Sequence, residues 1–440
     1  MPVIVKEYHN NFKIVYEKSH SDLPITALYI FCDVGPVYEY DKMRGASHFV
    51  EHMCFKGTKK IPHSKDIFHE YAKIGADFNA FTSKRYTCYT VKCQDIYVQH
   101  CLDILSDMLS NSLFDKVEFT REEKVVIEEN NNNDNNPEYL LELATNRIIY
   151  AGSSYEFPAD CLDYHKNRNL DHKNIVEFYR DYYRQNHMFL SVVSNLPFKE
   201  IESYFKHTLF CKKITDRREP IRVINQCITP QSNIRYQIIK KRGVTNAHIN
   251  IGFRVCGRNN SDKYGLLLLE KIMGDGLSGR LLMVLRERNG LVYGASATTE
   301  FYEQYGGFTF STKTKRENFS QVLPLLVQII GDMIKNGVTN EELLTVKGNF
   351  KGNVLLSLQS IVTQAQYNGE EIIFNLERNS THSKIIPYQD VYDKCIRDIT
   401  VSDVNRIIKH YFTRENMCVC VLSEKLPSLE IIQKECASII

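Results

Sequence analysis

The sequence feature that most constrains the fold is an internal repeat. Residues 178–193 (FYRDYYRQNHMFLSVV) align with residues 407–422 (IIKHYFTRENMCVCVL) at an offset of 229. Each copy predicts a helix that ends in aromatic residues, a polar turn, and a strand of β-branched and apolar residues. A second match places Ala27–Asp33 on Ala247–Phe253 at an offset of 220. Ordered matches at about half the chain length indicate two domains of one fold, not a solenoid.

The composition agrees with two globular domains. The chain has 440 residues, of which 43% are hydrophobic and 25% are charged, as is typical of ordinary folded proteins. Each half mixes alternating strands with amphipathic helices, so we expect an α+β fold in which each domain is a mostly antiparallel sheet with helices packed on it. The expected domains are residues 1–211 and 234–440, joined by an ordered linker at 212–233.

Charge and hydropathy exclude several function classes. The formal net charge of +2 provides no excess that would predict a nucleic-acid or membrane-surface partner. No apolar run approaches 18 residues, the length that a membrane span requires. We expect the 13 cysteines to be reduced thiols, and the first residues lack a signal or transit pattern. Together these features predict a cytoplasmic protein.

The most specific chemical signal is the segment GASHFVEH, residues 45–52. On a helix, His48 and His52 lie one turn apart on the same face, a spacing at which two imidazoles can bind one zinc ion. Glu51 lies three residues after His48, so its carboxylate points toward the same edge and can take a proton from a metal-bound water. This H-x-x-E-H pattern inverts the familiar H-E-x-x-H pattern.

The repeat makes this signal more specific. At an offset of 220, the positions of His48, Glu51 and His52 become Leu268, Lys271 and Ile272 in the second half. The fold therefore does not require polar residues at these positions. Their presence in the first half alone indicates a chemical role.

A catalytic zinc site requires a third protein ligand. The segment 120–130 (TREEKVVIEEN) predicts a helix with four candidate carboxylates, although a run of glutamates is also typical of a solvated helix face. The residues alone leave the choice open. We expect the helix to fray or end early in the following run, residues 130–137 (NNNNDNNP), because asparagine is a poor helix former. The candidates are Glu122, Glu123, Glu128 and Glu129.

The segment GASHFVEHMCFKGT resembles the active-site helix of the pitrilysin, insulysin and mitochondrial processing peptidase family of zinc peptidases. The family places its third ligand about 77 residues after the second histidine, within E-x-x-x-x-x-x-E, which corresponds to Glu129 here; Glu128 is the fallback. The resemblance implies one Zn²⁺ per chain, held by His48, His52 and Glu129. It also implies Glu51 as general base and Glu122 as the acid that supports a histidine ligand.

Two further segments extend the resemblance over nearly the whole chain. Residues 75–82 (GADFNAFT) are similar to the family strand on which the substrate peptide adds by backbone pairing, which implies substrate binding at Asn79 and Ala80. Residues 285–293 (LRERNGLVY) resemble the family's R-x-x-x-x-x-x-Y motif. The resemblance implies that Arg286 and Tyr293 contact the substrate. The glycines of MGDGLSGR, residues 273–280, match the glycine-containing loop that precedes that motif and do not form a phosphate loop.

These motifs predict a zinc-dependent endopeptidase that hydrolyses extended or unfolded peptides, with Glu51 as general base on a zinc-bound water. The alternative is a catalytically inactive family member that acts as a structural or partner-binding subunit. A hydrolase of non-peptide substrates is less favoured, because GADFNAFT suits an extended peptide.

The resemblance also implies an assembly. The family encloses its active site with four such domains, whereas this chain has two. We therefore expect a homodimer, or a heterodimer with a related chain, in which Arg286 and Tyr293 of one subunit face the zinc of the other.

Overall fold

The computed structural model describes residues 2–8, 11–160, 170–212, 227–274, 278–374, 385–437 and Ile439. These residues form two compact units, each built from three stretches of chain. The expected linker lies largely outside the described residues, at 213–226, so its order and the division at 212–233 stay predictions. The first unit comprises Met1–Asn132, Phe157–Asn225 and Val354–Asp390, and the second comprises Asn133–Glu156, Gln226–Asn353 and Val391–Ile440.

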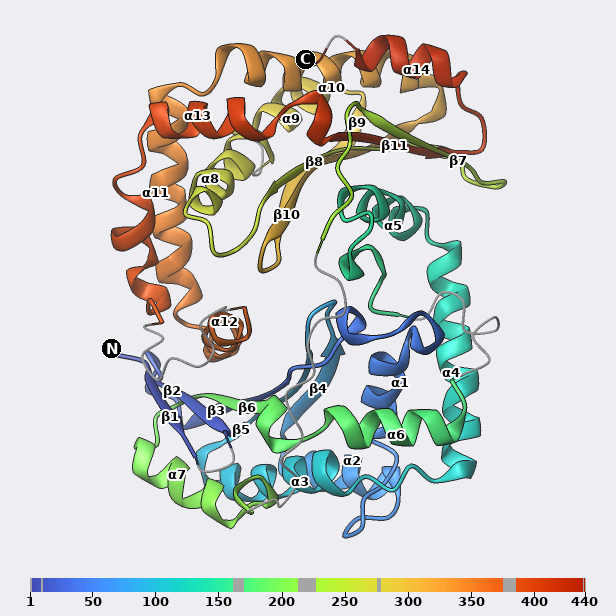
Figure 1. Cartoon of the computed structure of the whole chain (residues 1–440). Coiled ribbons are helices and arrows are strands. Elements are labelled where there is room, and N and C mark those ends of the chain that lie inside the picture. Colours follow the sequence, from blue (N-terminus) through green and yellow to red (C-terminus); the bar gives the residue numbers. More distant parts are fainter. Residues whose placement is uncertain are drawn as a thin grey trace. The chain divides into compact units, whose positions relative to one another are not determined.

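The first unit contains a six-stranded sheet of order β1-β2-β6-β3-β5-β4 (Figure 1). β2 and β6 are parallel, whereas the other neighbouring strands are antiparallel. β4 lies at an edge, so one side of its backbone faces away from the sheet. The strands are β1 (Ile4–Glu7), β2 (Lys13–Lys18), β3 (Ile25–Cys32), β4 (Asp77–Thr82), β5 (Thr87–Gln94) and β6 (Met188–Ser194).

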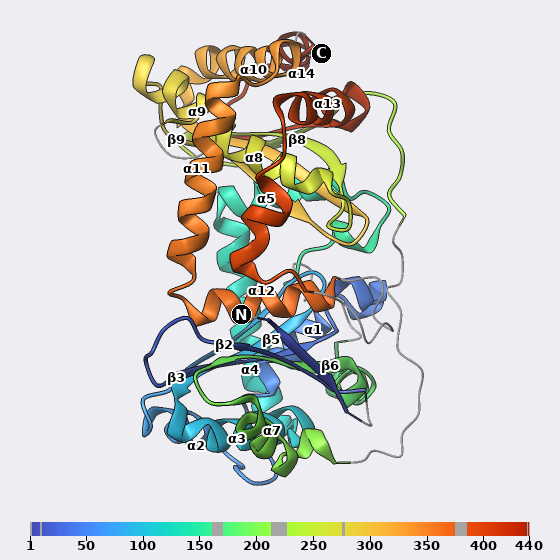
Figure 2. The same ribbon diagram turned by 90° about the vertical axis from the view of Figure 1, so that its left-hand side faces the viewer.

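Helices cover both faces of this sheet. α2, α3 and α7 lie on one side of it and α12 lies on the other (Figure 2). α1 contacts β4 and β5, which places the segment with both histidines at the edge of the sheet. The helices of this unit are α1 (Ala46–Met53), α2 (Ser64–Ala72), α3 (Val98–Asn111), α4 (Lys116–Asn135), α6 (His172–Tyr182), α7 (Phe198–His207) and α12 (Ile361–Ile373).

The second unit repeats this arrangement with a five-stranded sheet of order β7-β11-β8-β10-β9. β7 and β11 are parallel, and the other neighbours are antiparallel. Two like α+β units confirm the predicted fold class. The strands are β7 (Arg235–Lys240), β8 (Asn246–Cys256), β9 (Val292–Phe301), β10 (Tyr305–Lys315) and β11 (Met417–Ser423), and the helices are α5 (Pro137–Ile149), α8 (Asp262–Gly274), α9 (Arg280–Leu282), a π-helix (Met283–Arg288), α10 (Phe319–Asn336), α11 (Asn340–Ser357), α13 (Val401–Tyr411) and α14 (Leu429–Cys436).

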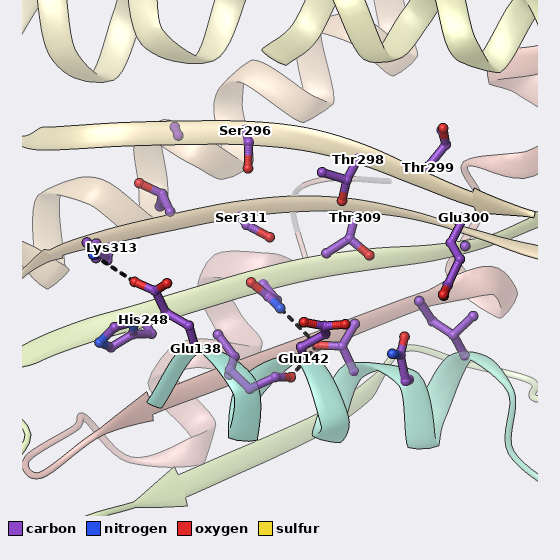
Figure 3. Close-up of a pocket in the computed structure, with 18 of the residues that line it drawn as sticks. Glu138, Glu142, His248, Ser296, Thr298, Thr299, Glu300, Thr309, Ser311 and Lys313 are labelled. Carbon is purple, nitrogen blue, oxygen red and sulfur yellow. Dashed lines mark hydrogen bonds and ion pairs between the residues drawn. The ribbon is translucent and has the colours of Figure 1, made fainter. Parts of the chain in front are cut away.

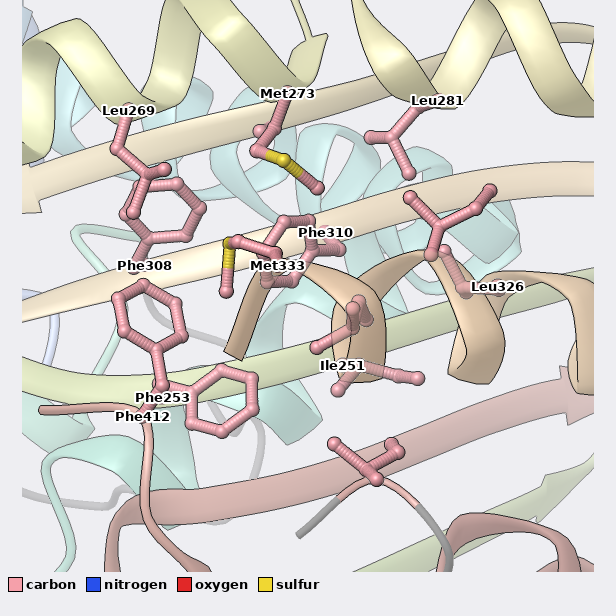
Figure 4. Packing of buried hydrophobic residues seen from close by; sticks show 14 of the residues in the cluster. Ile251, Phe253, Leu269, Met273, Leu281, Phe308, Phe310, Leu326, Met333 and Phe412 are labelled. Carbon is pink, nitrogen blue, oxygen red and sulfur yellow. The ribbon is translucent and has the colours of Figure 1, made fainter. Parts of the chain in front are cut away.

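The core of the second unit forms between one face of its sheet and the helices α8, α10 and α13 (Figure 4). Phe253 of β8 and Phe308 of β10 are fully buried, and both rings contact Phe412, at centroid distances of 4.8 and 5.1 Å. α10 buries its apolar face in this cluster. Among the described residues, no single helix is long and apolar enough to cross a bilayer. The segment that ends with α10 and the following α11 are long and apolar enough only when taken together, and they are bent by 103° with respect to each other.

The two halves of the sequence exchange a helix. In the first half of the chain, α5 follows α4 but packs on β8 and β11 of the second unit. In the second half, α12 follows α11 but packs on β3 and β6 of the first unit. Each half of the sequence therefore supplies a helix that covers one face of the sheet formed mainly by the other half. The compact units therefore interleave the two halves of the sequence.

The pairing register corrects one of the two repeat offsets. Leu28 of β3 pairs with Val192, and Ile249 of β8 pairs with Val421. Since Val192 and Val421 are equivalent at the offset of 229, Leu28 is the structural counterpart of Ile249. The offset between β3 and β8 is therefore 221, not the predicted 220. A shift of one residue moves every side chain of a strand to the other face. Continuous apolar runs do not show which residues face which side, so they could not determine this offset.

The expectation that the helix with the third-ligand candidates ends early is wrong. α4 continues through the asparagine run to Asn135. Asn130 is buried, and Asn136 ends the run by capping α5, because its side chain accepts hydrogen bonds from the backbone of Glu138 and Tyr139. Tertiary packing and the cap of the next helix outweigh the low helix propensity of asparagine.

Substitution of Gly369 tests the packing of α12 on its sheet. A Cβ atom at this position would lie 2.0 Å from the ring of Phe31. Gly369→Ala is therefore expected to lower the free energy of unfolding by about 1–3 kcal/mol, because the ring or the helix must move. Gly348→Ala on α11 is the control: nothing lies within 4 Å of its Cβ position, so the change should stabilise by about 0.5–1 kcal/mol. Urea unfolding measures both, and equal effects would contradict this packing.

Candidate metal centre

The helix that carries the histidines begins at a capped terminus. Gly45 precedes α1 with φ of 92°, a left-handed conformation that glycine adopts without strain. The two carboxylate oxygens of Glu39 accept hydrogen bonds from the backbone N–H groups of Gly45 at 2.8 Å and Ser47 at 2.7 Å. Glu39 is 1% exposed. It accepts hydrogen bonds from N–H groups at the start of α1, which have no carbonyl partner within the helix. Burial raises the pKa of its carboxyl, and the bonds from Ser47 and Gly45 oppose that shift.

His48, His52 and Glu129 converge on one point. The Nε2 atoms of the two histidines lie 3.2 Å apart. A carboxylate oxygen of Glu129, on α4, lies 3.9 Å from Nε2 of His48 and 3.6 Å from Nε2 of His52. The three ligand atoms all lie within 4.8 Å of one another. A seven-residue span on α4 thus places Glu129 near both histidines and, as shown next, Glu122 behind one of them.

Glu122 fixes the orientation of His52. Its Oε1 atom lies 2.8 Å from Nδ1 of His52, and its Oε2 atom accepts from Nζ of Lys56 at 2.5 Å. A carboxylate at Nδ1 holds the proton on that nitrogen, which leaves the lone pair of Nε2 directed at His48 and Glu129. Glu122 is buried, and the resulting interaction connects α1 to α4.

The environment sets the charge of the two imidazoles differently. Burial, and then the nearby charge of His52, lowers the pKa of His48 to about 3. Burial also disfavours the charged form of His52, but the hydrogen bond that its Nδ1–H donates to Glu122 and the charges of Glu129 and Glu51 outweigh this effect and raise the pKa of His52. His48 is therefore a neutral imidazole at pH 7, the form that binds a metal ion.

Glu51 projects from the same helix and is 7% exposed. Its Oε2 atom accepts a hydrogen bond of 2.6 Å from the hydroxyl of Thr82, the last residue of β4. Burial raises the pKa of Glu51, and the bond from Thr82 opposes that shift. The carboxylate is thus held in one orientation beside the histidines.

β4 provides an open backbone edge next to this group. Asn79 and Ala80 lie in the middle of the strand and pair with Thr90 and Tyr89 of β5. The N–H of Ala80 donates to Oδ1 of Asn79 at 2.9 Å. The side chain of Asn79 therefore occupies a backbone donor that an added peptide strand would need.

Arg286 and Tyr293 lie together in the second unit. Arg286 is in the π-helix, and Tyr293 is the second residue of β9, with 83% of its surface exposed. The guanidinium carbon lies 5.4 Å from the centre of the tyrosine ring. Of the glycine loop before them, residue 276 lies outside the described residues.

Sequence reasoning missed three supporting residues. Glu39 accepts from the backbone at the start of α1. Thr82 donates to Glu51, and Lys56 pairs with Glu122. Glu39 lies six residues before Gly45, too far for a local helix-cap signal, so its contact with the start of α1 depends on tertiary structure. The contact of Thr82 with Glu51 depends on tertiary packing and carries no local signal.

The residues present fit a zinc ion. Two imidazole nitrogens and one carboxylate form a donor set used by catalytic zinc sites. One imidazole is neutral, and the other is held by a carboxylate in the tautomer that exposes Nε2. Glu129, with 44% of its side chain exposed, closes the group on its solvent side.

Fold and site together define a duplicated α+β protein whose first half brings together two histidines and a glutamate that could hold a metal ion. Comparisons with known proteins agree with that definition. A family model described as insulinase (peptidase family M16) matches residues 13–159, and one described as the peptidase M16 inactive domain matches residues 169–350. The chain belongs to the insulinase-like peptidase family M16.

Relatives span nearly the whole chain. The uncharacterized zinc protease YmxG of Bacillus subtilis is 26% identical over 94% of this chain and 97% of its own length. In fold, the chain is similar to a protease from Helicobacter pylori, with a TM-score of 0.85 at 21% identity over 96% of this chain and 100% of that one. It is also similar to the periplasmic protease PqqL of Escherichia coli, with a TM-score of 0.79 at 18% identity over 100% of this chain and 50% of that one.

Removal of the Glu39 carboxylate tests the helix cap. Glu39→Ala leaves two buried N–H groups at the start of α1 without their acceptor, so α1 should lose precision and the affinity for zinc should fall about tenfold. Asp41→Ala is the control, because its side chain is 92% exposed and contacts Arg44 rather than α1. Competition with a chelating dye measures the affinities. Wild-type affinity in Glu39→Ala would show that the cap does not position the ligands.

Proposed function

We propose that this protein is a zinc-dependent endopeptidase that hydrolyses extended or unfolded peptides. One observation carries the proposal: His48, His52 and Glu129 bring three ligand atoms within 4.8 Å of one another, while the carboxylate of Glu51, on the same helix, is held by Thr82. His48, His52 and Glu129 would hold one zinc ion. Glu122 would support His52.

Zinc, when bound, supplies a Lewis acid that polarises a peptide carbonyl and makes water more acidic. Glu51 takes a proton from the attacking water and passes it to the leaving amine. The hydroxyl of Thr82 donates to one oxygen of Glu51 and leaves the other free for this transfer. Glu122 keeps the proton of His52 on Nδ1 throughout.

An extended peptide is the substrate class that the adjacent strand favours. β4 ends at Thr82, the residue that holds Glu51, so a peptide paired with its open edge runs past the general base. Asn79 and Ala80 would bind the peptide backbone. The side chain of Asn79 must release the N–H of Ala80 when a substrate carbonyl takes its place.

An inactive, partner-binding family member is the rival function. The family model described as an inactive domain matches residues 169–350, a stretch that follows His48, His52 and Glu129 in the chain. The first half keeps a complete donor set and a general-base candidate, which supports the peptidase.

The free thiols among the described cysteines support a reducing location such as the cytosol.

We further propose that two chains form the complete active site, in a homodimer or with a related partner. The whole of this chain corresponds to half the length of PqqL, which supports a four-domain assembly made from two chains. Arg286 and Tyr293 of one subunit would contact the substrate bound at the zinc of the other, with Tyr293 near the developing oxyanion.

Glu51→Gln tests the general base. The amide cannot take a proton, so peptide hydrolysis should fall about 10²–10⁴-fold, while zinc content and thermal stability stay near wild type. Cleavage of a quenched fluorescent peptide library, with zinc content measured by mass spectrometry, provides the readout. Chelator should abolish the wild-type rate and added zinc should restore it. Undiminished activity in Glu51→Gln would leave the inactive, partner-binding function as the better account.

Mixing two inactive variants tests the assembly. In a dimer of Glu51→Gln with Arg286→Ala chains, one site combines an intact zinc half with an intact Arg286. Random exchange of subunits should therefore restore about a quarter of wild-type activity. Each variant alone should stay inactive under the same conditions. If the mixture is as inactive as its components, zinc and Arg286 do not come from different subunits. The same conclusion follows if light scattering shows that the chain is a monomer under conditions in which it cleaves peptides.

A further inference from the structure

The segment that carries Arg286 is wound as a π-helix, residues 283–288. Its turn is wider than an α-helical turn, because the hydrogen bonds of a π-helix join residues five apart rather than four apart. Such turns are rare and are found frequently at functional sites. If this turn relaxed to an α-helix, Arg286 would rotate about the helix axis. The position of its guanidinium therefore depends on the contacts that hold the π-helix.

Tyr293 lies in a second backbone irregularity, a β-bulge. Between the pairs Val292–Thr314 and Ala295–Thr312, two residues of β9 lie opposite one residue of β10. Bulges redirect a side chain and are common beside active sites. Figure 3 shows the regular stretch of β9 and β10 beyond the bulge. The sheet fixes the backbone on both sides of Tyr293, so the alignment of the two side chains is decided by the helix.

An ion pair holds the start of the helical segment. Arg280, the first residue of α9, donates from Nε to one oxygen of Glu342 at 2.6 Å and from Nη2 to the other at 2.7 Å. Nη2 also donates to the carbonyl of Gly337 at 2.9 Å. Gly337 follows α10, and Glu342 lies in the first turn of α11. One guanidinium thus joins α9 to the connection between two other helices, and its two-point contact fixes direction as well as distance.

Glu342 is itself held in place. Its Oε2 atom accepts from the backbone N–H of Thr339 at 2.8 Å, and its own N–H donates to the hydroxyl of Thr339 at 3.2 Å, which are the reciprocal bonds of a capping box. Burial raises the pKa of Glu342, but the hydrogen bonds from Arg280 and Thr339 outweigh this effect and lower the pKa. Arg280 therefore meets a fixed anion at the start of α11.

Apolar packing provides depth but no direction. Leu281 of α9 and Leu285 of the π-helix are fully buried in the core of the second unit. Contacts of this kind are non-directional, so they keep the segment against the core and leave its rotation less well determined. The ion pair supplies the directional contact at the start of the segment.

We propose that Arg280 and Glu342 are positioning residues for Arg286: their ion pair holds the π-helix in the rotation that brings its guanidinium to the tyrosine of the β-bulge. The two side chains do meet, since the guanidinium carbon of Arg286 lies 5.4 Å from the centre of the Tyr293 ring. A substrate contact that uses both side chains requires both to be in place at once. The consequence for substrate rests on the proposed peptidase function, whereas the alignment needs neither zinc nor peptide.

Fluorescence tests the alignment. The chain contains no tryptophan, so Tyr293→Trp introduces a single indole at the position that Arg286 contacts. In this background Arg286→Ala should free the indole and lower its steady-state anisotropy. Arg280→Met keeps the apolar stem but removes the guanidinium, and should lower the anisotropy to the same value. Arg280→Lys keeps the charge without the two-point geometry and should restore part of the loss.

Two further variants sharpen this test. Glu342→Gln breaks the pair from its other side, keeps an acceptor for the capping box, and should reproduce the loss of anisotropy. Arg406→Met is the matched control, because Arg406 makes a similar two-point pair with Asp262, at 2.5 and 3.2 Å, between α13 and α8 of the same unit. It should leave the anisotropy unchanged. The proposal is overturned if Arg280→Met and Glu342→Gln leave the indole as it is, or if Arg406→Met affects it equally.

Peptide affinity tests the consequence. The probe is a fluorescein-labelled peptide that the wild-type chain cleaves, bound to the full chain with Glu51→Gln. Arg280→Met should weaken binding about tenfold. Added to Arg286→Ala, it should weaken binding by less than about twofold more, because the group that it positions is already gone. Fully additive losses would overturn the proposal. If the wild-type chain cleaves no peptide while the indole responds as expected, the peptidase function alone is refuted.

Discussion

The hydrogen bond between Nδ1 of His52 and Glu122 is the interaction on which the metal centre depends. It joins α1, which carries both histidines, to α4, which carries Glu129, and it selects the tautomer that exposes Nε2. Apolar packing also relates the two helices, since the rings of Phe49 on α1 and Phe119 on α4 lie 4.8 Å apart, but the hydrogen bond alone orients the ring of His52. Lys56 balances the buried charge of Glu122, and Glu39 fixes the opposite end of α1. Two carboxylates that need not touch metal, Glu122 and Glu39, thus determine where the donors lie.

The second unit shows how a duplicated fold divides its tasks. At an offset of 220 or 221 the position of His48 falls on a buried leucine, Leu268 or Leu269, so the corresponding helix of the second unit packs into the core. Its polar residues lie instead on the sheet face beside α5. The first unit does the opposite, since aromatic rings fill that face and polar groups gather on α1. Each copy keeps the common core and changes the chemistry of one surface.

Much of the fold was predictable because it has local signals. Helix-to-strand segments repeated at an offset of 229 became α6 with β6 and α13 with β11. The spacing of His48 and His52 determines their shared face, and Glu129 follows from the resemblance to a known family. What could not be predicted depends on contacts between distant residues. The strand offset of 221 is set by pairing, the continuation of α4 by packing, and the roles of Glu39 and Thr82 by tertiary hydrogen bonds.

The exchange of α5 and α12 has a consequence for how the chain holds together. Each half of the sequence carries the helix that covers the other half's sheet. A fragment that ends after the first half would expose an uncovered sheet face and carry an amphipathic helix, α5, whose apolar side has nothing to cover. The two halves are therefore complementary fragments rather than autonomous modules. Selection can alter their surfaces separately, but it cannot separate the halves without rebuilding both cores.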